Sequence, residues 1–87
     1  MTVPNAAYAA GIVQAGTTPT LICTGDTRLI QNTGSITAYL GGPTVTATTG
    51  YPLPAGAPIT IPPGDGVPRD LYAITAASNT TIAYLQP

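Results

Sequence analysis

The sequence predicts a small all-β protein, an antiparallel β-sandwich or barrel of about seven short strands with an extended N-terminal arm. Runs rich in β-branched and aromatic residues recur along the chain, and glycine and proline, ten of each, separate them. The connections are too short for the crossovers that parallel strands need, so the strands are expected to be antiparallel. With 87 residues the chain makes one domain, which we place at 17–87 after an arm at 1–16.

The expected strands follow one another between well-marked turns. They are TPTLIC (18–23), RLIQN (28–32), SITAYL (35–40), TVTAT (44–48), PITI (58–61), DLYAITA (70–76) and TTIAYL (80–85). The turns between them are TGDT (24–27), NTG (32–34), GGP (41–43), LPAGAP (53–58), PPGDGVP (62–68) and ASN (77–79).

The strand SITAYL shows how the faces of the sheets are expected to divide. Side chains alternate along a strand, so Ile36, Ala38 and Leu40 share the core face. Thr37 and Tyr39 take the opposite face, which carries no charge. Two interpretations stay open: a neighbouring protein covers this face, or threonine simply faces solvent as a good strand residue.

The first sixteen residues lack the alternation of a strand. They could form a helical turn or two after Asn5, but Gly11 and the many small residues make an isolated helix marginal. We expect an arm that becomes ordered against a neighbouring protein, and a frayed terminus is the alternative.

Charge is the most unusual property of the composition. Only 6% of residues are charged, against about 25% in ordinary soluble proteins, and Lys, Glu and His are absent. The charged residues are Asp26, Arg28, Asp65, Arg69 and Asp70. A surface that owes its polarity to 16 threonines loses water at little cost, which favours burial against other proteins. Two arginines and a net charge of -1 argue against nucleic acid as a partner.

Few residues could carry chemistry. Cys23 has no histidine to activate it and lies in the apolar run LIC, so we expect a buried structural cysteine. Asp65 and Asp70 flank a loop that also holds Arg69, which fits a surface turn as well as an acid–base pair. We therefore predict no enzymatic activity, no cofactor and no metal site. The apolar stretch near the N-terminus is broken by Gly11 and Gly16, so we expect no membrane partner.

Two features point to self-association. A domain of this size usually needs a staple, and one cysteine cannot form an internal disulfide, so oligomerisation remains. Tyrosine supplies contact area with a hydrogen-bonding end and is enriched at interfaces. The candidate subunit-interface residues are Thr37, Tyr39, Tyr51, Tyr72 and Tyr84.

The order of strands and turns from 21 to 85 resembles the small β-domain head decoration or minor capsid proteins of tailed bacteriophages. The residues that carry the resemblance form a scaffold: Asn32 and Gly34 at the first turn, 39–42 (YLGG) ending a strand, Gly50 with 52–53 (PL) before a Pro/Gly turn, and 71–74 (LYAI). The N-terminal residues and the loop PPGDGVPRD lie outside this pattern.

The resemblance implies a structural virion protein, a homotrimer that binds the major capsid protein on the outer capsid surface after synthesis in the host cytoplasm. The arm would then hold the capsid-binding residues, which we place at Val3, Pro4, Tyr8, Ile12 and Val13. Related domains recur in phage fibres, so the alternative is a host-surface or glycan-binding module of a fibre or tail.

Overall fold

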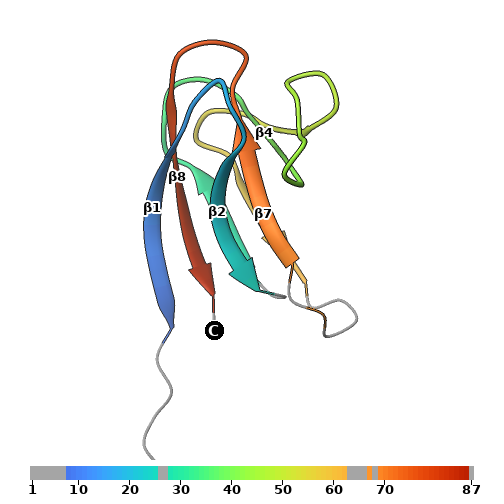
Figure 1. Ribbon diagram of the computed structural model, residues 1–87. Helices are drawn as coiled ribbons and strands as arrows, with labels where there is room; N and C mark the ends of the chain where they lie inside the picture. The colour runs from blue at the N-terminus through green and yellow to red at the C-terminus, as the bar shows by residue number, and fades with distance from the viewer. Residues whose placement is uncertain (1–7, 26–27, 63–66, 68, 87) are drawn as a thin grey trace, which may run out of the picture.

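The computed structural model is a β-sandwich of two four-stranded sheets, which confirms the predicted all-β fold class (Figure 1). The structure describes residues 8–25, 28–62, 67 and 69–86, and within them it contains eight strands and no helix. The strands are β1 (Ala9–Ala15), β2 (Thr20–Gly25), β3 (Arg28–Asn32), β4 (Ala38–Gly41), β5 (Tyr51–Leu53), β6 (Pro58–Ile61), β7 (Arg69–Ile74) and β8 (Thr80–Gln86).

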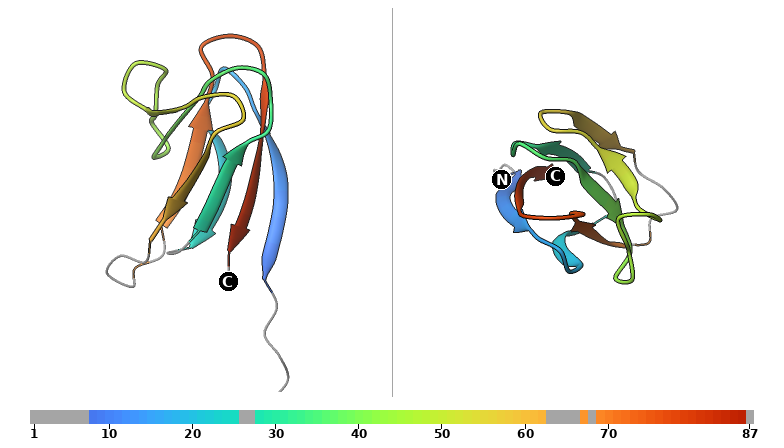
Figure 2. Two further views of the ribbon diagram at one scale, coloured as in Figure 1. Left: turned by 180° about the vertical axis from the view of Figure 1, so that it is seen from behind. Right: turned by 90° about the horizontal axis from the view of Figure 1, so that it is seen from above.

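The two sheets form separate layers, as the views from behind and from above show (Figure 2). The first sheet has the strand order β1-β8-β3-β6 and the second has the order β2-β7-β4-β5, with every pairing antiparallel. No pairing among the described strands joins the two layers, so the fold is a sandwich and not a closed barrel. Only β4 and β5 are neighbours both in sequence and in a sheet. The chain therefore passes from one layer to the other at each of the six remaining connections between consecutive described strands.

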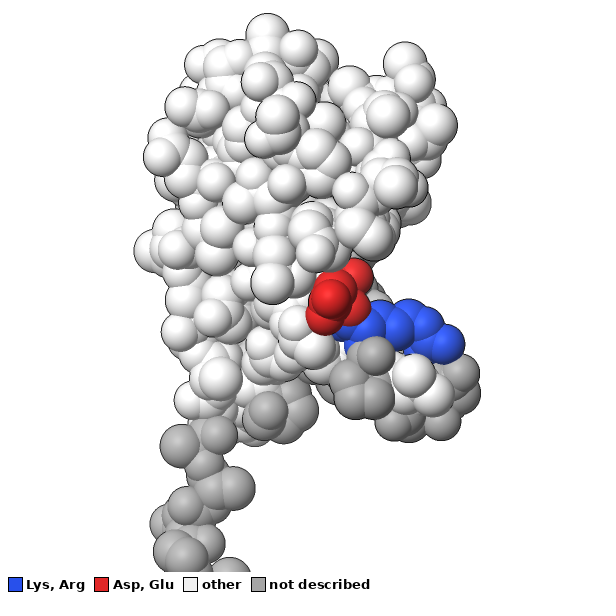
Figure 3. Space-filling model, viewed as in Figure 1, with Lys and Arg blue, Asp and Glu red and all other residues white. Residues whose placement is uncertain are grey.

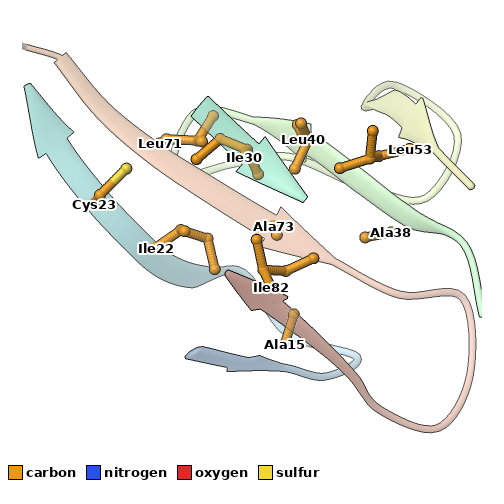
Figure 4. Close-up of a cluster of buried hydrophobic side chains, with 10 residues drawn as sticks. All are labelled: Ala15, Ile22, Cys23, Ile30, Ala38, Leu40, Leu53, Leu71, Ala73 and Ile82. Atoms are coloured by element: carbon orange, nitrogen blue, oxygen red, sulfur yellow. The ribbon is translucent and has the colours of Figure 1, made fainter. Parts of the chain in front are cut away.

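The core lies between the layers and is built from small aliphatic side chains (Figure 4). Ile30 on β3 and Ile82 on β8 are fully buried, and burial of each contributes about 1.5–3 kcal/mol. Ala38 and Leu40 are buried as predicted, whereas Ile36 is only half-buried because it precedes β4. The ten buried residues of the cluster are Ala15, Ile22, Cys23, Ile30, Ala38, Leu40, Leu53, Leu71, Ala73 and Ile82.

Asn32, at the end of β3, is the polar centre of the interior. Its side-chain Nδ2 donates hydrogen bonds to the carbonyl oxygens of Ile36 (2.7 Å) and Leu53 (2.9 Å). Its Oδ1 accepts from the Thr80 hydroxyl (2.7 Å) and from the Gly34 amide (3.1 Å). All the hydrogen-bonding positions of this buried amide are thus used, and they connect the turn after β3 with β5 and β8.

The structure corrects the prediction of an arm at 1–16. Residues 9–15 form β1, which pairs with β8 from Ala9↔Gln86 to Ala15↔Thr80. The alternation is present but uses small residues: Val13 packs against the core and Ala15 is buried, whereas Ile12 and Gln14 are exposed. Residues 1–7 lie outside the described part of the chain.

A second correction concerns residues 44–48, which were predicted as a strand and form turns. The Thr46 hydroxyl contacts the hydroxyls of Thr48 (3.1 Å) and Thr49 (2.8 Å), and the Thr46 carbonyl accepts from the Gly50 amide (2.9 Å). Threonine hydroxyls that bond to nearby groups compete with strand pairing, and here the local bonds prevail. The strand in this region is instead β5, which was not predicted and which follows the loop at the edge of the second sheet.

Candidate functional site

The residues proposed for the N-terminal arm are described only in part, and the described ones do not share one face. Val3 and Pro4 lie outside the described residues. Tyr8 and Ile12 are exposed, whereas Val13 packs against the core from the other face of β1. Ile12 is therefore available to a partner, and Val13 serves the fold.

The residues proposed for a subunit interface lie on several surfaces. Tyr39 and Tyr72 are half-buried on the outer face of the second sheet, since they alternate with the buried Leu40 and Ala73. Tyr84 instead packs against the core from the first sheet. Two of these tyrosines therefore face outward from the second sheet, and the third faces inward from the first sheet.

The remaining two members of that set lie apart from Tyr39 and Tyr72. Tyr51 is exposed on the edge strand β5, opposite Leu40 in register. Thr37 is half-buried just before β4 begins. The five residues therefore do not form one continuous surface.

A better candidate surface is the outer face of the first sheet. Leu85 on β8 pairs with Ala10 of β1 on one side and with Leu29 of β3 on the other, and in the next row Ala83 pairs with Ile12. Residues directly opposite one another share a face, so these five side chains cover three adjacent strands. We call this surface, made of Ala10, Ile12, Leu29, Ala83 and Leu85, the apolar face.

The apolar face exposes large side chains to solvent. Ile12 is 72% exposed, Leu29 41% and Leu85 40%. A hollow of about 170 Å³ lies on the same surface and is lined by Leu29, Gln31, Pro58, Ala83, Tyr84 and Leu85. Contiguous apolar surface of this kind marks interaction sites in soluble proteins.

The described charges lie away from the apolar face. Arg28 begins β3, and Arg69 and Asp70 begin β7, so all three gather at one end of the sandwich (Figure 3). Among the described residues, a partner that covers the apolar face therefore has no charged side chain to strip of water, and this lowers the cost of binding.

The edge of the first sheet adds a second means of contact. β1 is seven residues long and, within the described structure, pairs only with β8. Its free edge has no proline and no charge, which are the features that usually protect an edge strand from pairing. The backbone of β1 can thus accept another strand beside the apolar face.

Cys23 is a core residue, as the sequence predicted. It belongs to the buried cluster, and burial raises the pKa of its thiol, an effect that the nearby Arg28 charge partly opposes. The thiol therefore keeps its proton at neutral pH. Among the described residues no group of three or more His, Cys, Asp or Glu is placed to hold a metal ion.

Sequence reasoning missed the position of Arg28. It is 4% exposed, in phase with Ile30 and Asn32 on the inward face of β3. The alternation R-x-I-x-N already indicates this phase, because Ile30 was a clear core candidate. The position of Arg28 two residues before a core isoleucine was therefore the signal that could have shown that its side chain faces inward.

In the described part of the chain, no helix is both long enough and apolar enough to cross a membrane.

Comparison of the chain with protein-family models, with curated proteins and with solved structures found no match.

Proposed function

We propose that this protein is a non-enzymatic structural component of a tailed-bacteriophage virion that decorates the outer capsid surface and reinforces contacts between major capsid subunits. The apolar face carries the proposal, because an uncharged surface across three strands suits permanent burial against protein. The phage setting rests on the resemblance of the scaffold residues between 21 and 85.

The energetics of docking follow from the exposed side chains. When a partner covers the exposed side chain of Ile12 or Leu85, apolar surface is removed from water. Each Å² of apolar surface buried in this way contributes about 25 cal/mol of favourable binding free energy. The threonines and Gln14 that border this surface supply a polar rim, which is the usual anatomy of a protein interface. A few such side chains therefore suffice for a specific contact of moderate strength.

Trimerisation would multiply that strength. A homotrimer presents three apolar faces, and once one has docked the others bind at a high effective concentration. Avidity can then exceed a single contact by about 100-fold or more without any new interaction. The free edge of β1 offers backbone hydrogen bonds to the same assembly.

The test is the location and copy number of the protein on purified particles. Quantitative mass spectrometry should give many copies per particle, in fixed proportion to the major capsid protein, and cryo-electron microscopy should place them on the outer shell. A few copies confined to the tail would contradict the proposal and favour the fibre alternative.

The docking surface can be tested on the same particles. A photo-crosslinking amino acid at Ile12 should join the protein to a major capsid subunit or to another copy of itself. The matched control places the same amino acid at Thr48, which is exposed on the loop before β5. Equal crosslinking from both positions would show that the apolar face has no special role.

A further inference from the structure

The charged end of the sandwich holds a pocket of about 410 Å³. This volume lies near the lower limit of ordinary small-molecule sites. The lining residues come from the ends of five strands and the loops beside them: Gly25, Arg28, Gly41, Gly42, Ile61, Pro62, Arg69, Asp70 and Leu71. All three described charged residues thus share one pocket.

Arg28 is the unusual member of this lining. Its side chain is 4% exposed, and its Nη2 donates one hydrogen bond to the Arg69 carbonyl oxygen (3.0 Å). Its Nε is buried and has no hydrogen-bond partner among the described residues. Within that part of the chain, no carboxylate lies within ion-pair distance of the guanidinium.

The described carboxylate in the same pocket has a different partner. Asp70 accepts a hydrogen bond of 2.6 Å from the Thr24 hydroxyl, its cross-strand neighbour on β2. An arginine does not lose its proton in proteins, so Arg28 remains a cation in a poorly hydrated position. A buried charge of this kind is stable only when an anion or several acceptors compensate it.

We propose that this pocket binds a carboxylate attached to a small apolar group, with Arg28 as the main anchor of the carboxylate. This site is separate from the apolar face and does not depend on the proposed capsid function. Arginine presents donors in a fork that matches the two oxygens of a carboxylate.

The rest of the lining selects the class of ligand. Ile61, Pro62 and Leu71 supply an apolar wall, which suits a short hydrocarbon beside the carboxylate. Asp70 brings a negative charge into the pocket, which disfavours a doubly charged group such as phosphate. The same carboxylate chemistry could come from a free organic acid or from the C-terminus of a peptide that ends in an apolar residue.

Titrations followed by amide NMR test the site directly, in buffers free of carboxylates. With 3-methylbutanoate, the amides of Gly41, Gly42 and Leu71 should shift and saturate, with a Kd of about 1 mM, as expected for so small a ligand. The neutral analogue 3-methylbutan-1-ol and inorganic phosphate should each bind at least about tenfold more weakly, because each lacks one of the two recognised parts.

Peptides distinguish the two sources of the carboxylate. A tripeptide that ends in leucine should bind through its free C-terminus and lose binding when that end is amidated. Tighter binding by the tripeptide than by 3-methylbutanoate identifies a chain end as the ligand, and the reverse order identifies a free acid. Equal binding of the free and amidated peptides would overturn the assignment of a carboxylate.

Two variants test the residues. Arg28→Met keeps an apolar stem and should weaken binding of 3-methylbutanoate about tenfold or more, the loss expected for a charge-assisted hydrogen bond. Gly42→Leu adds a bulky side chain at the pocket lining and leaves Arg28 unchanged, so it should hinder binding. The fold can accept the new side chain, because a Cβ at Gly42 meets no heavy atom within 4 Å. Thr44→Leu, exposed on the same loop outside the pocket lining, is the matched control and should bind normally.

Three outcomes would overturn the proposal. The first is the absence of saturable binding by the wild-type protein, and the second is unchanged binding by the folded Gly42→Leu variant. The third is that Asp26→Asn or Asp65→Asn binds 3-methylbutanoate whereas the wild type does not. A carboxylate of the chain itself would then be the partner of Arg28.

Discussion

The phenol ring of Tyr84 lies over Gly11, its cross-strand partner in β1. A Cβ at Gly11 would come within 2.7 Å of the ring atoms Cε1 and Cζ and of the hydroxyl. The glycine thus leaves room for an aromatic side chain that packs against the core from β8. An aromatic ring placed over a strand glycine is a known means of stabilising a sheet at an edge.

Adding a methyl group at this contact should therefore destabilise the protein. We expect Gly11→Ala to lower the free energy of unfolding by about 1–3 kcal/mol, because the ring must leave its packed position. Urea denaturation followed by circular dichroism measures the change. Gly42→Ala is the matched control and should have an effect within about 0.5 kcal/mol, because its Cβ has open space.

A double-mutant cycle isolates the contact itself. In a Tyr84→Leu background the shorter side chain leaves room for the new methyl group, so Gly11→Ala should cost much less than in the wild type. The same cost in both backgrounds would mean that the ring is not the cause.

Replacing the buried Asn32 by aspartate should be far more damaging than its size suggests. Asn32→Asp removes both donors to the carbonyls of Ile36 and Leu53 and introduces a charge into the interior. We expect a loss of about 3 kcal/mol or more at neutral pH. Gln31→Glu makes the same chemical change at the exposed neighbouring position and should cost less than about 0.5 kcal/mol.

The pH dependence gives Asn32→Asp a distinctive signature. Burial raises the pKa of a carboxyl group, so the folded variant binds a proton more readily than the unfolded chain does. Stability of the variant should thus recover as pH falls from the raised pKa of the introduced carboxyl group towards about 4, the ordinary range of an aspartate. The recovery should be complete below that pH, and stability should decline again as pH rises. A stability deficit that stays constant from pH ~3 to ~7 would contradict this account.

The positions of some strands were predictable from local sequence, and the positions of others were not. Residues 28–32 and 58–61 were predicted with the observed limits of β3 and β6, because each is a short run with β-branched residues between clear turn signals. β1 was missed because its inward positions carry Gly11, Val13 and Ala15, and residues this small give no visible alternation. What makes them a strand is the partner β8, about 70 residues away along the chain, which a local pattern cannot show.

The candidate surfaces show the same limit. Tyrosine content suggested the interface, but whether a tyrosine faces inward depends on register, and Tyr84 packs against the core. The apolar face depends on rows that cross β1, β8 and β3, which are far apart in sequence. Its lack of charge, in contrast, was visible in the composition, because so few charged residues were available to place there.

Cys23 should make the stability fall at alkaline pH. Burial raises the pKa of this thiol, so the folded protein keeps the proton at a pH where the unfolded chain loses it. The contribution is complete below the ordinary pKa of cysteine and is lost as pH rises from there towards the raised value. The slope cannot exceed about 1.4 kcal/mol per pH unit for one proton.

The measurement is the free energy of unfolding from pH ~7 to ~10 for the wild type and for Cys23→Ala. Both proteins carry the same tyrosines, so the difference between the two curves reports the thiol. The variant should be less stable at neutral pH and should show a shallower decline. Parallel curves would mean that the thiol titrates alike in the folded and unfolded states.

The last prediction concerns self-association through the apolar face. Ile12→Lys places a charge at its most exposed position, and docking would then require the ammonium group to lose water. If the protein associates through this face, sedimentation equilibrium should show the dissociation constant of the oligomer rise about tenfold or more. Folding should be unaffected, because Ile12 lies outside the core cluster.

Gln14→Lys is the matched control, since Gln14 is exposed on the same side of β1 at a polar position. It adds the same charge to the same strand but removes no apolar contact, so it should weaken association less than Ile12→Lys does. Equal weakening by both variants would assign the effect to net charge. A wild-type protein that remains monomeric at concentrations of ~100 µM would contradict self-association itself, because that concentration corresponds to only about 5.5 kcal/mol of binding free energy.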